Sequence, residues 1–373
     1  MRVALDGRAI HDHFPGIGRY AYNLALALAR TQPDLELAVL HDPRQPNTRY
    51  PLAALQAYPN VRLVPVSAPT FAPAEQWRVP QTVRTSAAHV YHSPYYIMPY
   101  RPGVPTVVTV HDLIPLVPTA RYSRRARWLF AVTVRLALRA AQRVITVSSA
   151  SASDLTHRLG VPAGKIATIP EAADPAFVPQ PAAQVAAVRT RLGLPERYVL
   201  YVGSNKPHKN LERLVSTYLT LGSAPPLIVT GHWEARYPAA REIVQRADAE
   251  ARVRFLGPVA AEDLPALYTG ATLFVFPSLY EGFGLPPLEA LACGAPVACS
   301  RAASLPEVVG DAALLFDPLN PTEIAATLRR ALGDEALLAD LRRRGLARAA
   351  HYSWDQTAAQ TAAVYRAVAE GHA

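Results

Sequence analysis

The chain has 373 residues, half of them apolar, and it carries a formal net charge of +9. This length suits two domains, each with a sizeable core. No apolar run approaches the ~18 residues of a membrane span, and Asp6 interrupts the N-terminal segment where a signal peptide needs apolar residues, so we expect a cytoplasmic protein. Its two cysteines, Cys293 and Cys299, predict buried small side chains more than a disulfide or a metal site.

The first half of the chain alternates between short apolar strands and helices. The opening strand, VALDG, leads through a glycine loop into a helix with apolar residues at helical spacing. Further strands are predicted at residues 36–40, 61–66, 88–92, 106–112, 143–148 and 165–170. This alternation indicates a doubly wound parallel sheet with right-handed crossovers.

The glycine loop after the first strand is a candidate phosphate-binding site. Gly16 and Gly18 open the first helix, where backbone amides can meet a phosphate. The loop lacks the third glycine of a dinucleotide-binding fingerprint, so NAD binding is a weak interpretation. A purely structural turn is the alternative.

His111 and Asp112 end a predicted strand, on the side of the sheet where ligands bind. His111 can donate a hydrogen bond to a sugar hydroxyl or influence charge near a reacting carbon. A structural histidine is the alternative. Asp112 either positions His111 or caps the turn.

The segment from Arg121 to Arg143 holds much of the excess positive charge, with seven arginines and no acidic residue. As a helix it has a mostly apolar side, formed by Trp128, Leu129, Val132, Leu136 and Leu138. Such a helix can attach to an anionic membrane surface or an anionic substrate, or it can pack on the core with a solvated basic face. Nucleic acid is not expected, because the stretch lacks aromatic platforms and no binding module is recognisable.

A proline-rich stretch near residue 175 is interpreted as a linker, because the strand and helix rhythm restarts after it. Strands of the second half are predicted at residues 198–203, 226–231, 252–257, 272–276, 296–300 and 313–316. The pattern therefore predicts two Rossmann-like halves with the ligand site in a cleft between them, beyond the carboxyl ends of the strands.

Lysine is rare in this chain, with three lysines against 35 arginines, yet Lys206 and Lys209 lie together in GSNKPHKN. A compact ammonium at the end of a strand suits the oxygens of a diphosphate whose charge grows as the leaving group departs. Lys209 is the first choice for this role and Lys206 the second. A solvated loop is the alternative.

The most informative segment runs from Phe276 to Pro296, where Glu281 and Glu289 bracket a glycine-rich turn. A strand enters this turn and a helix starts at Pro286. The amides ahead of the helix are those of Gly282, Phe283, Gly284 and Leu285.

Unpaired N–H groups and the helix dipole at such a turn favour a phosphate. A carboxylate beside a phosphate would repel it, so Glu281 and Glu289 are interpreted as acceptors for sugar and ribose hydroxyls. The phosphate-binding amides and the two hydroxyl-binding carboxylates together predict a nucleotide-sugar site. The alternative is an ordinary strand–helix connection with two solvated glutamates.

Four segments together resemble the retaining, nucleotide-sugar-dependent GT-B glycosyltransferases called glycosyl transferases group 1: GIGRY, VTVHDLIPL, YVGSNKPHKNL and the Glu281–Glu289 motif. The last is the most specific. The segment YSWDQTAAQTAAVYRAV also resembles the family's terminal helix, which returns to pack on the first domain.

The resemblance implies an α/β GT-B fold, with two Rossmann-like doubly wound parallel-sheet domains facing a central cleft. Residues 1–175 would form an acceptor-binding domain, completed by a terminal helix at 355–373. Residues 176–354 would form the nucleotide-sugar-binding domain.

The resemblance also implies residue roles. Gly18, Lys209 and the amides from Phe283 to Leu285 would contact the donor diphosphate. Glu281 would face the donor sugar, Glu289 the ribose, and His111 the reacting centre. Many relatives carry an arginine directly after the strand-ending glycine, where this chain has Ser204, and Lys206 is a substitute for it.

The implied activity is transfer of a hexose from a nucleotide diphosphate sugar, with retained configuration and without a metal or cofactor. The segments HDLIP and GIGRY resemble those of a subgroup rich in mannosyltransferases of bacterial polysaccharide assembly. This resemblance suggests GDP-mannose as the donor. The implied partners are this donor, a lipid-linked or polysaccharide acceptor and the inner face of an anionic membrane. The alternatives are a GT-B sugar-nucleotide epimerase, a phosphorylase and a non-catalytic nucleotide-sugar binder. A phosphorylase would need a lysine that binds pyridoxal phosphate, and no such lysine is located in the sequence.

Overall fold

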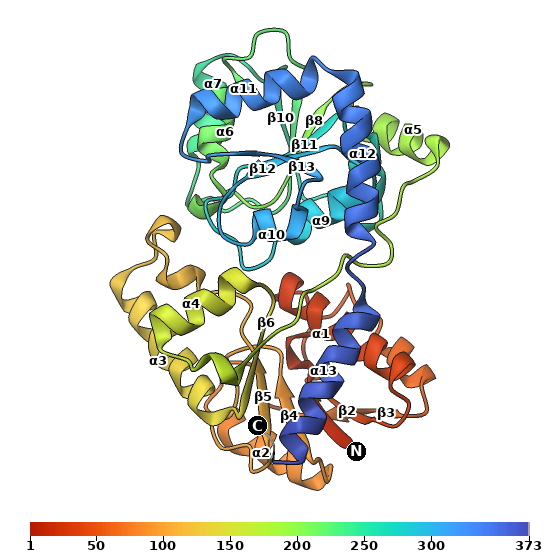
Figure 1. Cartoon of the computed structure of the whole chain (residues 1–373), viewed down its shortest axis with the longest axis vertical. Helices are drawn as coiled ribbons and strands as arrows, with labels where there is room; N and C mark the ends of the chain where they lie inside the picture. Colours follow the sequence, from red (N-terminus) through yellow and green to blue (C-terminus); the bar gives the residue numbers. More distant parts are fainter. Residues whose placement is uncertain (372–373) are drawn as a thin grey trace. The chain divides into compact units, whose positions relative to one another are not determined.

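The computed structural model describes residues 1–371, which divide into two compact units (Figure 1). Unit 1 comprises Met1–Leu116, Tyr122–Glu171 and the C-terminal segment from Ser353; unit 2 comprises Val117–Arg121 and Ala172–Tyr352. The boundary falls a few residues before the expected position near 175. The short segment 117–121 groups with unit 2, although its sequence neighbours belong to unit 1.

Unit 1 is built on a seven-stranded parallel sheet with the order β3-β2-β1-β4-β5-β6-β7. The strands are β1 (Arg2–Asp6), β2 (Glu36–His41), β3 (Val61–Pro65), β4 (Val90–Ser93), β5 (Thr106–Thr109), β6 (Arg143–Thr146) and β7 (Ile166–Thr168). Each lies at a predicted position. The central strands β1, β4 and β5 are buried along nearly their whole length, as expected where helices cover both faces of such a sheet.

The helices of unit 1 connect these strands. They are α1 (Pro15–Thr31), α2 (Glu75–Thr85), α3 (Arg124–Ala140) and α4 (Ser149–Leu159), with short 3₁₀ turns η1 (Gly7–Ala9), η2 (Leu52–Ala57), η3 (Ile114–Leu116) and η5 (Ala163–Lys165).

The C-terminal helix α13 (Trp354–Ala369) packs against α1, as the resemblance implied. Its Tyr365 hydroxyl lies 2.6 Å from Nδ1 of His92 on β4, and Arg366 pairs with Asp34 at 2.9 Å. Residues 372–373 of the expected terminal helix lie outside the described residues.

Unit 2 holds a six-stranded parallel sheet with the order β10-β9-β8-β11-β12-β13. Its strands are β8 (Val199–Val202), β9 (Leu227–Thr230), β10 (Val253–Gly257), β11 (Leu273–Phe276), β12 (Val297–Ser300) and β13 (Ala313–Phe316). Its helices are α5 (Ala182–Arg191), α6 (Leu211–Tyr218), α7 (Ala239–Arg246), α8 (Leu264–Gly270), α9 (Leu285–Ala292), α10 (Leu305–Val309), α11 (Pro321–Leu332) and α12 (Glu335–Ala349), with turns η4 (Pro118–Ala120), η6 (Pro207–Lys209) and η7 (Ala261–Asp263).

The two faces of this sheet bury separate cores, because strand side chains alternate between faces. On β11, Leu273 and Val275 pack with α6, α7 and α11, whereas Phe274 and Phe276 pack with α8 and α9. Both sheets therefore have helices on both faces, and the predicted pair of doubly wound domains is confirmed. Cys293 and Cys299 are buried in the second of these cores and form no disulfide, as predicted; burial raises the pKa of both thiols.

Each sheet reverses its strand order once, between β1 and β4 in unit 1 and between β8 and β11 in unit 2. In open parallel sheets, ligands bind beyond the carboxyl ends of the strands at such a reversal, because the two adjoining loops leave in opposite directions and open a crevice. The loops after β8 and β11 are therefore where a ligand of unit 2 is expected. They carry Lys209 and Glu281.

Candidate active site

Lys209 and Glu281 form an ion pair across the strand reversal of unit 2. Nζ of Lys209 donates to Oε1 of Glu281 at 2.7 Å, and the two side chains are only 17% and 10% exposed. Nζ also lies 5.2 Å from the ring centroid of Phe276, at the end of β11. Two residues 72 positions apart in the sequence are thus brought together by the sheet topology.

The carbonyl oxygen of His208 ties the two loops together. It accepts a hydrogen bond from the amide of Leu279 at 2.7 Å, and the hydroxyl oxygen of Ser278 lies 3.0 Å from it. Asn210, in the left-handed conformation with φ of 57°, donates from its side chain to the carbonyl of Pro277 at 3.1 Å. These bonds hold the backbone of Lys209 in a fixed position relative to the loop of Glu281.

Two serines fix the carboxylate and the turn behind it. The Ser278 hydroxyl donates to Oε1 of Glu281 at 2.5 Å, so the same oxygen receives Lys209 and Ser278. The Ser304 hydroxyl lies within hydrogen-bond distance of the carbonyls of Glu281 and Phe283, at 3.0 and 2.5 Å. Neither serine was singled out from the sequence, although Ser278 directly follows the β11 strand and its proline, where functional side chains gather.

The turn before α9 offers three backbone donors. The amides of Phe283, Gly284 and Leu285 have no acceptor within residues 1–371, and the next two residues are prolines without an N–H. Gly284 has a φ of 122°, and a Cβ there would approach Cδ2 of Leu305 to 2.7 Å. Glycine therefore keeps this turn open for an anion at the helix N-terminus.

Glu289 is buried on α9 and accepts a hydrogen bond from the Tyr268 hydroxyl at 3.1 Å. It lies about one turn after the start of α9, in the wall of the core that holds Tyr268. A ribose contact through Glu289 stays a prediction.

The remaining candidate residues of unit 2, Ser204 and Lys206, have different partners from those of Lys209. Ser204 contributes its carbonyl to the Tyr201 hydroxyl at 2.7 Å. Lys206 is 42% exposed and lies 3.6 Å from Glu234, so it points to a different acidic partner from Lys209. Lys206 thus has a separate partner from the Lys209–Glu281 pair, and its substitution for the missing arginine stays a prediction.

The electrostatics of the pair extend to its neighbours. Burial, together with the charge of Lys209, lowers the pKa of His208 to about 4, so this histidine is neutral near pH 7. Burial and the negative charge of Glu281 raise the pKa of the Tyr201 hydroxyl. His208 and Tyr201 therefore add no charge beside the Lys209–Glu281 pair at neutral pH.

In unit 1, the contacts of Gly18 are structural, which is the alternative that the sequence left open for this loop. Its amide donates to the carbonyl of Phe14 at 2.7 Å, and a Cβ at this position would approach the carbonyl of Ala9 to 2.8 Å. Gly18 thus allows α1 to pack against η1, and its N–H is already used within the helix. Gly16 lies in the first turn of α1, where N–H groups lack intrahelical partners, and a Cβ there would meet nothing within 4 Å.

His111 is held by two acceptors. Nδ1 lies 2.7 Å from Oε1 of Glu171 and Nε2 lies 3.0 Å from the carbonyl oxygen of Pro94. A carboxylate and a carbonyl both accept, so the doubly protonated imidazolium satisfies both contacts. Burial alone would lower the pKa of His111, but the hydrogen bond and charge of Glu171 outweigh it, and the net shift is upward.

These contacts bear on the two roles that the sequence left open for His111. Both ring nitrogens are engaged, so donation to a sugar hydroxyl is not available in this conformation, whereas an effect of its positive charge is. Glu171 was missed in the sequence, although it follows strand β7 just as His111 follows β5 at the same edge of the sheet. Asp112 caps the next turn, since its Oδ1 accepts from the amide of Ile114 at 2.8 Å.

The apolar side predicted for the basic helix α3 is divided between the core and the surface, because Leu138 is buried whereas Trp128 and Leu129 are exposed. Phe130, Val134, Ala137 and Leu138 pack into the core, whereas Trp128 and Leu129 are 66% and 55% exposed. The exposed pair stands beside the exposed arginines at positions 124, 125 and 127. Within residues 1–371 no helix is long and apolar enough to cross a membrane.

The described part of the chain contains no group of three or more His, Cys, Asp or Glu side chains arranged to hold a metal ion.

The sequence matches two glycosyltransferase families over most of its length. Residues 187–348 match Glycosyl transferases group 1, and residues 15–177 match Glycosyltransferase Family 4. The chain is 33% identical to the O-antigen chain mannosyltransferase B of Escherichia coli, over 98% of this chain and 100% of that protein. It is also 31% identical to the serotype-specific mannosyltransferase WbdA of Escherichia coli, over 68% of this chain but only 32% of that longer protein.

The fold is similar to that of a solved glycosyltransferase structure. Sucrose-phosphate synthase from Thermosynechococcus elongatus superposes with a TM-score of 0.77 at 24% identity, and the match covers 100% of both chains. This likeness supports the GT-B architecture expected from the sequence. Both halves of the chain match, and a full-length relative exceeds 30% identity, so the chain belongs to the glycosyl transferases group 1 family and is a glycosyltransferase.

Proposed function

We propose that this enzyme transfers mannose from GDP-mannose to a lipid-linked or polysaccharide acceptor, with retention of the anomeric configuration. The observation that carries the proposal is the Lys209–Glu281 pair beside the unpaired amides of Phe283, Gly284 and Leu285. A cation, a carboxylate and a set of N–H donors within one loop cluster suit a ligand that has both a diphosphate and sugar hydroxyls.

In this proposal the ion pair is the resting arrangement of the site. When a donor binds, the Lys209 ammonium turns to the phosphate oxygens and releases the carboxylate of Glu281. Ser278 still holds one oxygen of Glu281, which leaves the carboxylate oriented to accept from hydroxyls of the sugar. Glu289 takes the ribose hydroxyls in the same way.

The chemistry then consists of one bond exchange on one face of the sugar. The bond between the anomeric carbon and the phosphate oxygen breaks, and the acceptor oxygen bonds to the same carbon from the same side. The acceptor's proton passes to the departing phosphate. Lys209 and the three amides stabilise the negative charge that grows on the leaving group, and this contribution is expected to be large in a site with little water.

We further propose that the reaction needs neither a metal nor a cofactor. Support comes from the positive charge that the chain itself aims at the diphosphate, through Lys209 and the amides before α9. The charge of His111 in unit 1 is assigned to the same reaction as an electrostatic contribution.

Mannose is proposed because both named relatives are mannosyltransferases, one of them matched along its whole length. An epimerase or a phosphorylase is less well supported, because no relative named above carries either activity. A peripheral membrane location is proposed from α3, where Trp128 and Leu129 stand exposed beside arginines.

The test is a screen of GDP-, UDP- and ADP-sugars for thermal stabilisation and for sugar release or transfer. GDP-mannose is expected to stabilise the enzyme most and to turn over, and the anomeric configuration of the product is read by NMR. Stabilisation by every sugar without turnover would favour the non-catalytic binder. Inverted product would contradict the same-face reaction.

A further inference from the structure

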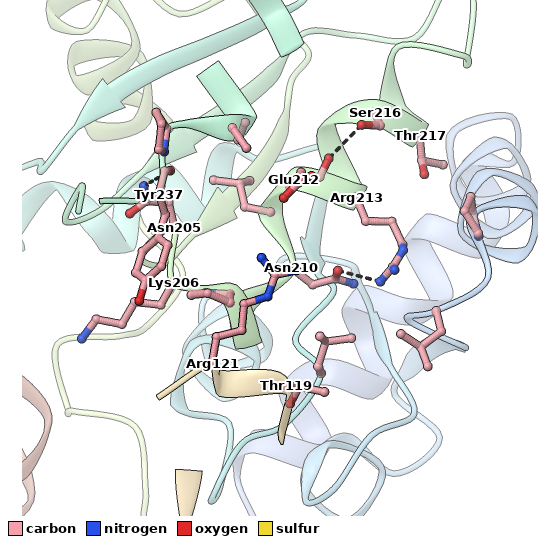
Figure 2. A pocket seen from close by; sticks show the side chains of 18 of the residues that line it. Thr119, Arg121, Asn205, Lys206, Asn210, Glu212, Arg213, Ser216, Thr217 and Tyr237 are labelled. Atoms are coloured by element: carbon pink, nitrogen blue, oxygen red, sulfur yellow. Dashed lines mark hydrogen bonds between the residues drawn. The ribbon is translucent and has the colours of Figure 1, made fainter. Parts of the chain in front are cut away.

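Unit 2 contains a second concave site, apart from the Lys209–Glu281 pair. It is a groove of about 880 Å³ between α6, α7, α11 and the η4 segment (Figure 2). We call it the α6–α7 groove. Lys206 lines it, whereas Lys209 and Glu281 do not. The loop from Gly203 to Asn210 therefore presents its two lysines to two different places.

The walls of the α6–α7 groove are strongly basic. One carboxylate, that of Glu212, is set against five cations. The cations are Arg121, Lys206, Arg213, Arg236 and Arg329. Like charges gathered in a concave surface raise the local potential and attract anions.

Most of these cations have only neutral partners. Arg213 donates to the Asn210 side chain at 2.8 Å, the bond drawn in Figure 2, and Arg329 approaches the carbonyl of Thr220 at 3.4 Å. Arg236 lies 5.6 Å from the ring centroid of Tyr237. Within residues 1–371, Lys206 is the one cation of the groove with a carboxylate at ion-pair distance, that of Glu234.

Backbone donors reinforce the positive potential. Helices α6 and α7 both begin without a side-chain cap. Their first-turn amides have no acceptor in the described chain, and these residues line the groove: Leu211, Glu212, Arg213, Ala239 and Ala240. Helix α11 differs, because Asn320 caps it, so its N-terminus adds nothing. Two uncapped N-termini that open into one basic groove suit an oxyanion.

A buried hydroxyl in the same wall also lacks a partner. Thr217 is 4% exposed and lines the groove, and its Oγ1 has no hydrogen-bond partner among the described residues. Buried polar atoms in native structures are nearly always satisfied, so an orphan hydroxyl indicates a missing ligand or water.

We propose that the α6–α7 groove binds the phosphate or diphosphate group of a second ligand, independently of the sugar donor. The groove is larger than one phosphate requires, so the ligand carries further atoms along α6. A phospholipid or glycolipid head group and a soluble phosphate ester share this chemistry. The inference does not rest on the donor specificity or the reaction proposed above.

The test measures binding of inorganic pyrophosphate to the full chain carrying Lys209→Ala, which weakens the donor site. Adding Arg121→Ala, Arg236→Ala and Arg329→Ala is expected to weaken this binding about tenfold or more, since three charged contacts are lost. The matched control replaces Arg246, Arg330 and Arg342, which remove the same charge from unit 2 outside the groove. Arg330 is the direct neighbour of Arg329 on α11.

Pyrophosphate binding that survives the groove substitutions, or that falls equally in the control, overturns the proposal; so does an absence of binding to the Lys209→Ala parent. Vesicles of phosphatidylglycerol identify the source of the phosphate. Flotation that depends on the groove arginines and is displaced by pyrophosphate supports a lipid head group. Groove-dependent pyrophosphate binding without any groove-dependent flotation supports a soluble phosphate ester. Thermal unfolding of each variant checks that it is folded.

Discussion

Lys209 and Glu281 neutralise each other at 2.7 Å, and each is the other's only ion-pair partner in the described structure. A resting pair of this kind stores both functional groups in their charged forms at a site that is mostly buried. Separating them costs energy unless a new partner arrives for each. A diphosphate for the lysine and sugar hydroxyls for the carboxylate are such partners.

Lys209→Ala is expected to lower kcat by roughly 100- to 1,000-fold, because a preorganised donor to the leaving group is lost. The measurement is steady-state transfer with the preferred donor. Lys206→Ala is the matched control and is expected to leave kcat nearly unchanged, since Lys206 faces Glu234 and the α6–α7 groove. An equal loss of kcat in both variants would contradict the proposal that Lys209 stabilises the leaving group.

Glu281→Gln is expected to reduce transfer far more than nucleotide binding, roughly 100-fold in kcat, because the amide cannot replace a carboxylate that accepts from sugar hydroxyls. Nucleotide affinity is measured by calorimetry with GDP. Ser278→Ala removes one hydrogen bond to the same carboxylate and should cause a smaller loss. Unchanged turnover in Glu281→Gln would contradict the proposed role.

Glu171→Gln is expected to lower the pKa of His111, since the carboxylate is what raises it against burial. His92, Asp112 and Tyr20 also surround the ring, but of these only Asp112 adds to the upward shift. A two-dimensional NMR titration of the imidazole measures the change.

The same contact gives a pH dependence with a defined sign. A folded-state pKa above the unfolded value of about 6.5 means that the contact contributes its full stability below that pH and loses it as the pH rises through the folded pKa. The melting temperatures of the parent and Glu171→Gln should therefore differ most at low pH and converge at high pH. Glu171→Asp keeps the charge and should be intermediate. A constant difference at all pH values would exclude the imidazolium.

Charge reversal of Arg124, Arg125 and Arg127 is expected to abolish flotation with anionic vesicles, because each arginine near such a surface contributes about 1 kcal/mol. Trp128→Ala should weaken flotation as well. Trp77→Ala is the control, since Trp77 on α2 is exposed to a similar extent, 59% against 66%. Flotation that survives the charge reversal would argue for a helix whose basic face is only solvated.

The strands could be predicted well because their signal is local. Each of the thirteen strands within residues 1–371 lies where a short apolar run was found, although β5 ends at Thr109 rather than at Asp112. The alternation on β11 between Val275 and Phe276 follows from the period of a strand.

The partners of the site residues could not be predicted in the same way. Glu171 lies 60 positions from His111, and Ser304 lies 23 positions from Glu281. Such pairs depend on which strands become neighbours and on the side-chain rotamers. A local sequence pattern predicts neither of these. The sequence left open which apolar residues of α3 are buried, for a related reason: Trp128 and Leu129 are apolar, but the core that α3 covers begins only at Phe130.

Helix α13 has a consequence for biosynthesis. Unit 1 contains the earliest strands, yet its His92 is paired with Tyr365, which the ribosome adds some 270 residues afterwards. Unit 2 has nearly all its elements on one uninterrupted stretch, from Ala172 to Tyr352. The nascent chain can therefore complete the folding of unit 2 before that of unit 1. The early strands of unit 1 stay incompletely covered until α13 emerges from the exit tunnel.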